Sequence, residues 1–319
     1  MRIKRILACL FAAATLFAVA GCGGDDNSLE DQGGSSDGGA GDKGSVTVGG
    51  QDFTESQVMA AIYQALLENE GFDVTTKLVQ TRDIYLPELS KGNVDIVPDY
   101  LSGITDFLNT EKNGPDAPLV SSHSPEKTLA ALKPLAEAKG ISVLAPSDAT
   151  DQNAFFVTTD FADENNLRTL SDLAALGQPI KLAANSDCPG RADCLDGLKN
   201  VYGLDISKFE PLEFGSAQMK DAVKSGEVDL GQTGTTDGTL TDAGFTLLQD
   251  DKGIQPAQNL TPVVNSDFLD ANPDLEALFD KLSQTLSTQD LAEMNAKVDV
   301  ERQKPEDVAN EFLTENGLI

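Results

Sequence analysis

Residues 89–96 read LSKGNVDI, and residues 223–230 read VKSGEVDL. Each stretch has the pattern of a helix end, a glycine that stops the helix, and a buried strand that carries an aspartate. The upstream strands match as well, because Val46 lies 46 residues before Gly92 and Ile180 lies 46 residues before Gly226. The sequence therefore predicts that one strand–helix–strand–helix–strand unit occurs twice.

The elements of the first unit can be placed individually. A short β-branched strand precedes Gly49 and Gly50, which we expect to break it. Thr54 and Gln57 have the spacing of a capping box at the start of an amphipathic helix. Strands that alternate with helices indicate parallel α/β sheets, and two such lobes predict a ligand cleft between them. The other expected elements are strands at 73–79 and 94–97, a helix at 84–91, and a mostly helical region at 261–319.

The N-terminus has the pattern of a bacterial lipoprotein signal. A basic start is followed by an uncharged, mostly apolar stretch that ends in Val-Ala-Gly directly before Cys22. Residues 1–21 are therefore predicted to be a signal peptide, with Cys22 as the lipidated residue. Residues 22–44 are rich in Gly, Ser and Asp, so we expect a flexible linker there.

Two cysteines remain for the folded part, Cys188 and Cys194. In an oxidising compartment a disulfide between them is expected. A zinc site would need more ligands, and His123 is the single histidine of the chain. No metal and no cofactor are predicted.

Composition excludes several classes of function. A formal charge of −29 would repel phosphate backbones, so nucleic-acid binding is not expected. No Gly-x-Ser-x-Gly elbow stands between an expected strand and an expected helix, and no P-loop or His-Glu-x-x-His motif occurs. His123 stands between serines before a proline, which favours a surface loop over a catalytic base. The chain is not expected to be an enzyme.

Several blocks of the sequence resemble the substrate-binding lipoproteins of osmoprotectant ABC importers, which take glycine betaine, choline, carnitine or proline. The opening block is GGQDFTE at 49–55, and DIVPDY follows at 95–100. Further on come an Arg-x-Asp block at 191–198 and Thr-Asp-Gly at 236–238. The resemblance extends to the C-terminus, so it covers the chain from about Val46.

This resemblance implies a type II periplasmic-binding-protein fold, α/β in class, with two lobes around a ligand cleft. Lobe one would comprise residues 45–150 and 256–319, and lobe two residues 151–255. It also implies a function: capture of a small polar solute and its delivery to an ABC permease and its ATPase. The protein would be a monomer on the extracytoplasmic face of the bacterial cell membrane, held there by its lipid anchor.

The family's site residues can be carried over by motif position. Gln51 and Arg191 match positions that bind the ligand's carboxylate, and Tyr100 matches one tyrosine of the aromatic cage around a quaternary ammonium. Thr236 belongs to the Thr-Asp-Gly block and is predicted to bind ligand. A core role for Tyr100 and a loop-shaping role for Thr236 are the alternatives.

Other cage positions depart from the family pattern. Gly234, Gln258 and Asn153 stand where the family has tyrosines, and we expect Gln258 and Asn153 to contact the ligand. Each lost ring removes about 0.5–2 kcal/mol of cation–π attraction. The resemblance therefore implies the transporter class, while the missing rings argue against betaine and favour an uncharged or zwitterionic solute with hydroxyls. The alternative function is a surface sensor or adhesion lipoprotein that keeps the fold without transport.

Overall fold

A computed structural model describes residues 43–319. The predicted signal peptide, Cys22 and the linker up to residue 42 lie outside the described residues. Between residues 43 and 319, no helix has both the length and the apolar character needed to cross a bilayer.

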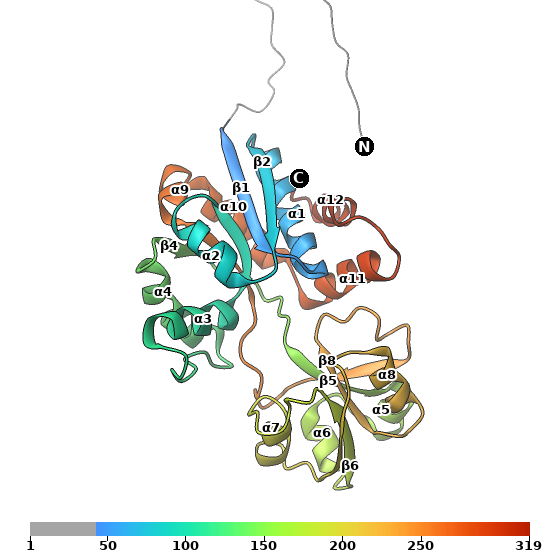
Figure 1. Ribbon diagram of the computed structural model, residues 1–319. Helices are drawn as coiled ribbons and strands as arrows, with labels where there is room; N and C mark the ends of the chain where they lie inside the picture. The colour runs from blue at the N-terminus through green and yellow to red at the C-terminus, as the bar shows by residue number, and fades with distance from the viewer. Residues whose placement is uncertain (1–42) are drawn as a thin grey trace, which may run out of the picture. The chain divides into compact units, whose positions relative to one another are not determined.

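The described strands form two five-stranded sheets, in the orders β2-β1-β3-β10-β4 and β7-β6-β8-β5-β9 (Figure 1). This is the α/β class that the sequence predicts. The strands are β1 (Ser45–Gln51), β2 (Asp73–Val79), β3 (Ile96–Tyr100), β4 (Ile141–Val143), β5 (Asn153–Thr158), β6 (Ile180–Ala184), β7 (Ile206–Pro211), β8 (Leu230–Gly234), β9 (Phe245–Leu248) and β10 (Leu260–Asn265). The helices are α1 (Thr54–Asn69), α2 (Arg82–Ser90), α3 (Leu101–Asn113), α4 (Pro125–Glu137), α5 (Thr159–Asn165), α6 (Leu170–Ala175), α7 (Leu195–Asn200), α8 (Ala217–Lys224), α9 (Ser266–Ala271), α10 (Asp274–Thr285), α11 (Thr288–Asp299) and α12 (Pro305–Glu315).

The predicted repeat is confirmed down to single hydrogen bonds. Strands β1, β2 and β3 are arranged as β6, β7 and β8 are, with parallel pairing in both sets. Asp95 accepts a hydrogen bond from the backbone N–H of Thr47 at 2.7 Å, and Asp229 accepts one from Lys181 at 2.8 Å. Each aspartate thus joins the third strand of a unit to its first.

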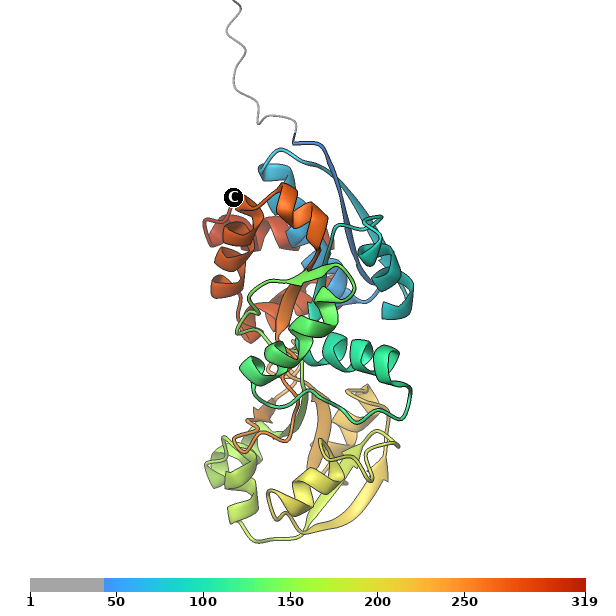
Figure 2. The same cartoon turned by 90° about the vertical axis from the view of Figure 1, so that its left-hand side faces the viewer.

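Alternating side chains of the strands divide the first sheet's apolar contacts between its two faces. Ile96 packs in the cluster that contains α1, α10, α11 and α12, whereas Val97 packs with α2, α3 and α4. The second sheet alternates in the same way, with Phe155 and Phe156 in different clusters. Figure 2 shows the helices of the first sheet on either side of its strands. Both sheets are therefore covered on two faces. The expected parallel pairing holds within each repeated unit, but both sheets are mixed, because β10 pairs antiparallel with β3 and β4, and β5 with β8 and β9.

Two details of the first unit differ from expectation. Strand β1 continues through Gly49 and Gly50 to Gln51 instead of breaking at the glycines. A Cβ on Gly49 would lie 2.7 Å from a methyl group of Val94, so glycine is needed there for close packing and not for a turn.

The predicted capping box is also wrong. The N-cap of α1 is Phe53, and no side chain caps the helix. Thr54 already belongs to the helix, and its hydroxyl donates to Asp299 Oδ1 at 2.7 Å. Gln57 donates its side-chain N–H to Asp52 at 2.8 Å. Sequence spacing could not reveal that a carboxylate 245 residues away takes the hydroxyl of Thr54.

The C-terminal region and the cysteines follow the predictions. After β10, helices α9 to α12 complete the described chain, and the apolar stripes of α10 and α12 are buried. Cys188 and Cys194 form a disulfide, and both are fully buried. His123 is exposed in the loop before α4.

Candidate functional site

A cavity of about 390 Å³ opens between residues of the first sheet's helices and loops of the second sheet. The start of α1 and the last turns of α11 supply one side. The end of β8, the loop after it, and the segment that enters α8 supply the other. The lining residues are Phe53, Thr54, Glu55, Asp151, Phe214, Gly215, Lys220, Thr233, Gly234, Thr236, Asp237, Gly238, Thr239, Asn295, Ala296 and Asp299.

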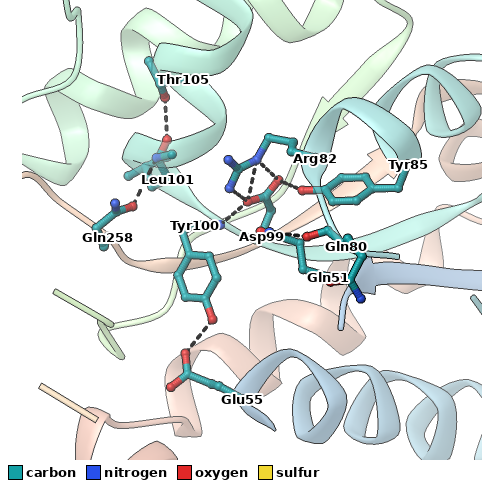
Figure 3. Close-up of polar contacts among 11 residues, drawn as sticks. Gln51, Glu55, Gln80, Arg82, Tyr85, Asp99, Tyr100, Leu101, Thr105 and Gln258 are labelled. Carbon is teal, nitrogen blue, oxygen red and sulfur yellow. Dashed lines mark hydrogen bonds and ion pairs between the residues drawn. The ribbon is translucent and has the colours of Figure 1, made fainter. Parts of the chain in front are cut away.

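Glu55 is the most enclosed acid of this cavity, with 3 % of its surface exposed. Its carboxylate accepts a hydrogen bond from Tyr100 Oη at 2.7 Å and another from Asn295 Nδ2 at 2.9 Å. Figure 3 shows the Tyr100 hydroxyl, at the end of β3, directed at Glu55 in the first turn of α1. Burial, followed by the charge of Glu55, raises the pKa of Tyr100 well above its ordinary value, so the phenol stays a neutral donor.

Asp151 is a second enclosed acid of the cavity. Thr236 donates its hydroxyl to Asp151 Oδ1 at 3.1 Å. Burial, followed by the charge of Glu55, raises the pKa of Asp151 from 3.8 to about 7. The hydrogen bond from Thr236 opposes this rise. Near neutral pH the aspartate can therefore change its charge state on a small change of surroundings.

A third acid, Asp237, is neutralised locally. Lys220 Nζ lies 2.7 Å from Asp237 Oδ2, and Thr233 donates to the same oxygen at 2.7 Å. Burial acts to raise the pKa of Asp237, but the hydrogen bonds from Lys220, Thr239 and Thr233 outweigh it, and the pKa is lowered. This ion pair fixes the loop that follows β8. Among residues 43–319, no three His, Cys, Asp or Glu side chains are grouped so that they could hold a metal ion.

Two phenylalanines bring apolar surface to the cavity, and the sequence analysis missed both. Phe53 precedes α1 and is 38 % exposed, and Phe214 precedes α8 and is 40 % exposed. The ring of Phe53 also stacks on Tyr100, with 6.3 Å between the centroids. The sequence held one indication of their role: both phenylalanines fall outside the predicted helices and strands, where a large apolar side chain has no expected packing partner. Their exposure, which only the structure gives, marks them as ligand-facing candidates.

The predicted ligand residues are distributed over several places. Thr236 lines the cavity, and Tyr100 reaches it through Glu55. Gln51 ends β1 and donates to the backbone oxygen of Gln80 at 3.4 Å. Gln258 accepts from the backbone N–H of Gly103 at 3.1 Å, and Figure 3 shows it on the far side of Tyr100 from Glu55.

Arg191 and Asn153 lie together beside the disulfide loop. Arg191 donates to Asp193 from Nε at 2.9 Å and from Nη2 at 2.6 Å, and to Asp187 from Nη1 at 2.8 Å. Asn153 donates to Asp193 Oδ2 at 3.2 Å. The hydrogen bonds that Arg191 donates to Asp193 raise its pKa; burial acts to lower it, but the charge of Asp193 and the hydrogen bond to Asp187 add to the rise. The guanidinium is thus already paired with two carboxylates of its own loop.

A buried ion pair lies next to Tyr100, and no sequence motif predicted it. Arg82 Nη2 lies 2.6 Å from Asp99 Oδ1, and Asp99 is 1 % exposed. Tyr85 also donates its hydroxyl to Asp99 (Figure 3). Burial acts to lower the pKa of Arg82, but the charge of Asp99 prevails and raises it. The pair holds the end of β3, and with it Tyr100, in place.

Two five-stranded α/β sheets with an acid-lined cavity between their loops define a solute-binding protein of the two-lobed kind. Residues 44–315 match the family model of the substrate-binding domain of the ABC-type glycine betaine transport system, OpuAC. The chain belongs to this family.

Individual relatives agree with this assignment. A glycine-betaine-binding protein of Pseudomonas aeruginosa is 28 % identical over 86 % of this chain and 88 % of its own length. The carnitine transport binding protein OpuCC of Listeria monocytogenes is 26 % identical over 88 % of this chain and 90 % of its own. Apo YehZ from Escherichia coli superposes with a TM-score of 0.75 at 26 % identity, over 86 % of this chain and 99 % of that one. The protein is thus a substrate-binding protein of osmoprotectant ABC transporters, a group that works outside the cytoplasm.

Proposed function

We propose that this protein is a lipid-anchored solute-binding protein that captures a small polar solute outside the cell membrane and hands it to an ABC permease. The observation that carries the proposal is the cavity lined from both sheets. A ligand bound there would contact α1 and α11 on one side and the β8 and α8 loops on the other. Such a ligand would favour the closed arrangement, because only that arrangement lets both sets of groups touch it.

The proposed lobes follow the sheets. Lobe one comprises residues 45–150 and 256–319, and lobe two residues 151–255. The first sheet draws its strands from 45–143 and 260–265, and the second from 153–248, which supports these boundaries. We further propose that Gln51, Asn153, Arg191 and Gln258 border the ligand when the lobes close, and that the protein acts as a monomer.

The anchor is proposed from the sequence, because Cys22 follows a lipoprotein-type signal and precedes a flexible linker. A diacylglycerol group on the thiol of Cys22 would supply two acyl chains, and stable anchoring requires more than one. The permease that receives the solute would then lie in the same membrane.

Two measurements test the proposed function. Native mass spectrometry of protein purified without refolding should show a small bound solute. Small-angle scattering should then show a more compact particle with that solute than after its removal. A protein that carries no solute, and that keeps one radius of gyration in every osmolyte extract offered, would contradict the proposal.

Site variants locate the binding. Phe53→Ala and Phe214→Ala should each weaken solute binding about 3- to 30-fold, because each removes one ring face of the cavity. Val201→Ala is a matched control, since Val201 is 46 % exposed and lies outside the cavity lining. If Val201→Ala weakened binding as much as the phenylalanine variants, the cavity would not be the binding site.

A further inference from the structure

The cavity is acidic even after its internal pairing is taken into account. Its lining contains the carboxylates of Glu55, Asp151, Asp237 and Asp299, but only one amine, Lys220. Lys220 is committed to Asp237 at 2.7 Å. Neither Glu55 nor Asp151 has an ion-pair partner among residues 43–319, although both are enclosed. Carboxylates withdrawn from water without a cation are unfavourable, so this part of the cavity attracts positive charge.

The side-chain amide of Asn295 has an oxygen with no hydrogen-bond donor in the described part of the chain. Asn295 lines the same cavity and is only 9 % exposed. Its Nδ2 donates to Glu55 and to the backbone oxygen of Thr236, which fixes the orientation of the amide. Its Oδ1 is buried and accepts no hydrogen bond from any described residue. A buried acceptor without a donor calls for a donor from elsewhere.

The two arginines near the site do not offset this charge. Arg191 is paired with Asp187 and Asp193, so its loop carries a net negative charge. Arg82 is paired with Asp99 beneath Tyr100. A ligand carboxylate would therefore meet no unpaired cation of the described chain, whereas a ligand cation would meet two unpaired acids.

We propose that the cavity binds an organic ammonium ion that carries N–H donors, with Glu55, Asp151 and Asn295 as its acceptors and Phe53 and Phe214 against its apolar part. The inference rests on the proposed function, whose solute class it specifies. It replaces the uncharged or zwitterionic solute that the sequence favoured, because Arg191, matched there to a carboxylate-binding position, is already paired with Asp187 and Asp193.

An N–H-bearing cation fits these groups better than a trimethylammonium ion does. Three acceptors line the cavity, and a methylated nitrogen would leave the Asn295 Oδ1 without a donor. Gly234, which lines the cavity beside Asp151, offers no ring face there. The geometry therefore favours hydrogen bonds over an aromatic cage as the source of specificity.

Matched probes separate these two kinds of cation. Titration calorimetry would compare ethanolamine, putrescine and agmatine with choline, glycine betaine and carnitine. We expect one or more of the three amines to bind about tenfold or more tightly than every methylated probe. Equal affinities, a preference for a methylated probe, or no binding of any amine would overturn the inference.

Variants assign the acceptors. Asp151→Asn and Glu55→Gln should each weaken the tightest amine about 10- to 100-fold, since each removes a charged acceptor. Asp160→Asn, an exposed acid at the start of α5, is the control for net charge and should leave the affinity unchanged. Arg191→Ala should weaken it less than either acid variant, because the guanidinium is already paired with Asp187 and Asp193. A loss with Arg191→Ala equal to that of the acid variants would contradict the assignment.

Proton release gives a readout that a purely structural role would not produce. Because the pKa of Asp151 is about 7, a bound cation should drive off part of a proton at pH 7. The binding enthalpy should then differ between phosphate and Tris buffers, and Asp151→Asn should abolish the difference. A buffer dependence unchanged in that variant would count against a role for this acid. The charged and titratable groups around Asp151 are Glu55, Lys220, Asp237, Asp299 and Tyr100.

Failure of this inference differs from failure of the proposed function. A co-purified solute that is neutral or anionic, bound in a manner sensitive to Phe53→Ala, would reject the ammonium assignment and keep the solute-binding function. A protein that neither carries a solute nor changes its radius of gyration with any solute would reject both.

Discussion

Replacing Asp151 by asparagine should make the protein more stable at alkaline pH and leave it little changed in acid. Asp151 has its folded-state pKa raised from 3.8 to about 7, chiefly by burial and then by the charge of Glu55. The folded state therefore binds more protons than the unfolded state between these values. Stability from this group is fully present below about pH 4, and is lost as the pH rises to about 7.

The size of the effect follows from the shift. At about 1.4 kcal/mol per pKa unit, a rise from 3.8 to about 7 corresponds to at most about 4 kcal/mol. Asparagine keeps an oxygen that can accept from Thr236 and carries no charge at any pH. The variant should thus gain stability over the parent progressively between about pH 4 and pH 7, and keep that gain at higher pH.

Urea denaturation at several pH values between 5 and 8 measures this difference directly. The comparison of variant with parent cancels the titration of groups that do not interact with Asp151, and Asp160→Asn supplies the exposed control. A stability difference that stays constant from pH 5 to pH 8, or an Asp151→Asn protein that is less stable at pH 8, would falsify the reasoning.

Three further predictions concern the anchor, the bridge and the packing of the lobes. Cys22→Ser should release the protein from membranes, as measured by its partition into the soluble fraction after fractionation, and retention after a high-salt wash would contradict the anchor. Replacing both Cys188 and Cys194 by serine should lower the free energy of unfolding by about 2 kcal/mol, because the disulfide closes a short loop. Thiol alkylation of the denatured, unreduced parent protein should label neither cysteine. An unchanged urea midpoint in the double variant would refute the estimate. Gly238→Ala should destabilise the protein by about 2 kcal/mol or more, because a Cβ there would lie 2.0 Å from the backbone oxygen of Ala292 and 2.7 Å from Ala296 Cβ. Thermal unfolding measures this loss. The comparison variant is Gly177→Ala, whose added carbon meets nothing within 4 Å, so it separates the effect of close packing from that of backbone conformation.

The site was only partly accessible to sequence reasoning. Motif positions pointed to Thr236 and Tyr100, which lie at or next to the cavity. They also matched Arg191 to a position that binds a ligand carboxylate, whereas the structure pairs it with Asp187 and Asp193. In an acidic chain every cation has many possible partners, so pairing depends on how loops meet and not on residue type.

The fold was specified by local and periodic features of the sequence. The matched stretches around Gly92 and Gly226, with an aspartate three residues after each glycine, are sufficient to predict two like units, because helix ends and buried strands depend on nearby residues. The positive φ of Gly92 and Gly226, 73° and 75°, is the local conformation that those turns require.

Tertiary structure decided the rest. Thr54 met Asp299 instead of capping its helix, Gly49 filled a close contact with Val94, and Glu55 came to lie with Asn295 beside Asp151. These partners are separated by tens to hundreds of residues, and their contacts depend on the relative placement of packed elements. The sequence determined which strands and helices form and how they repeat, while the charge balance of the cavity arose only when side chains from both sheets were brought together out of water.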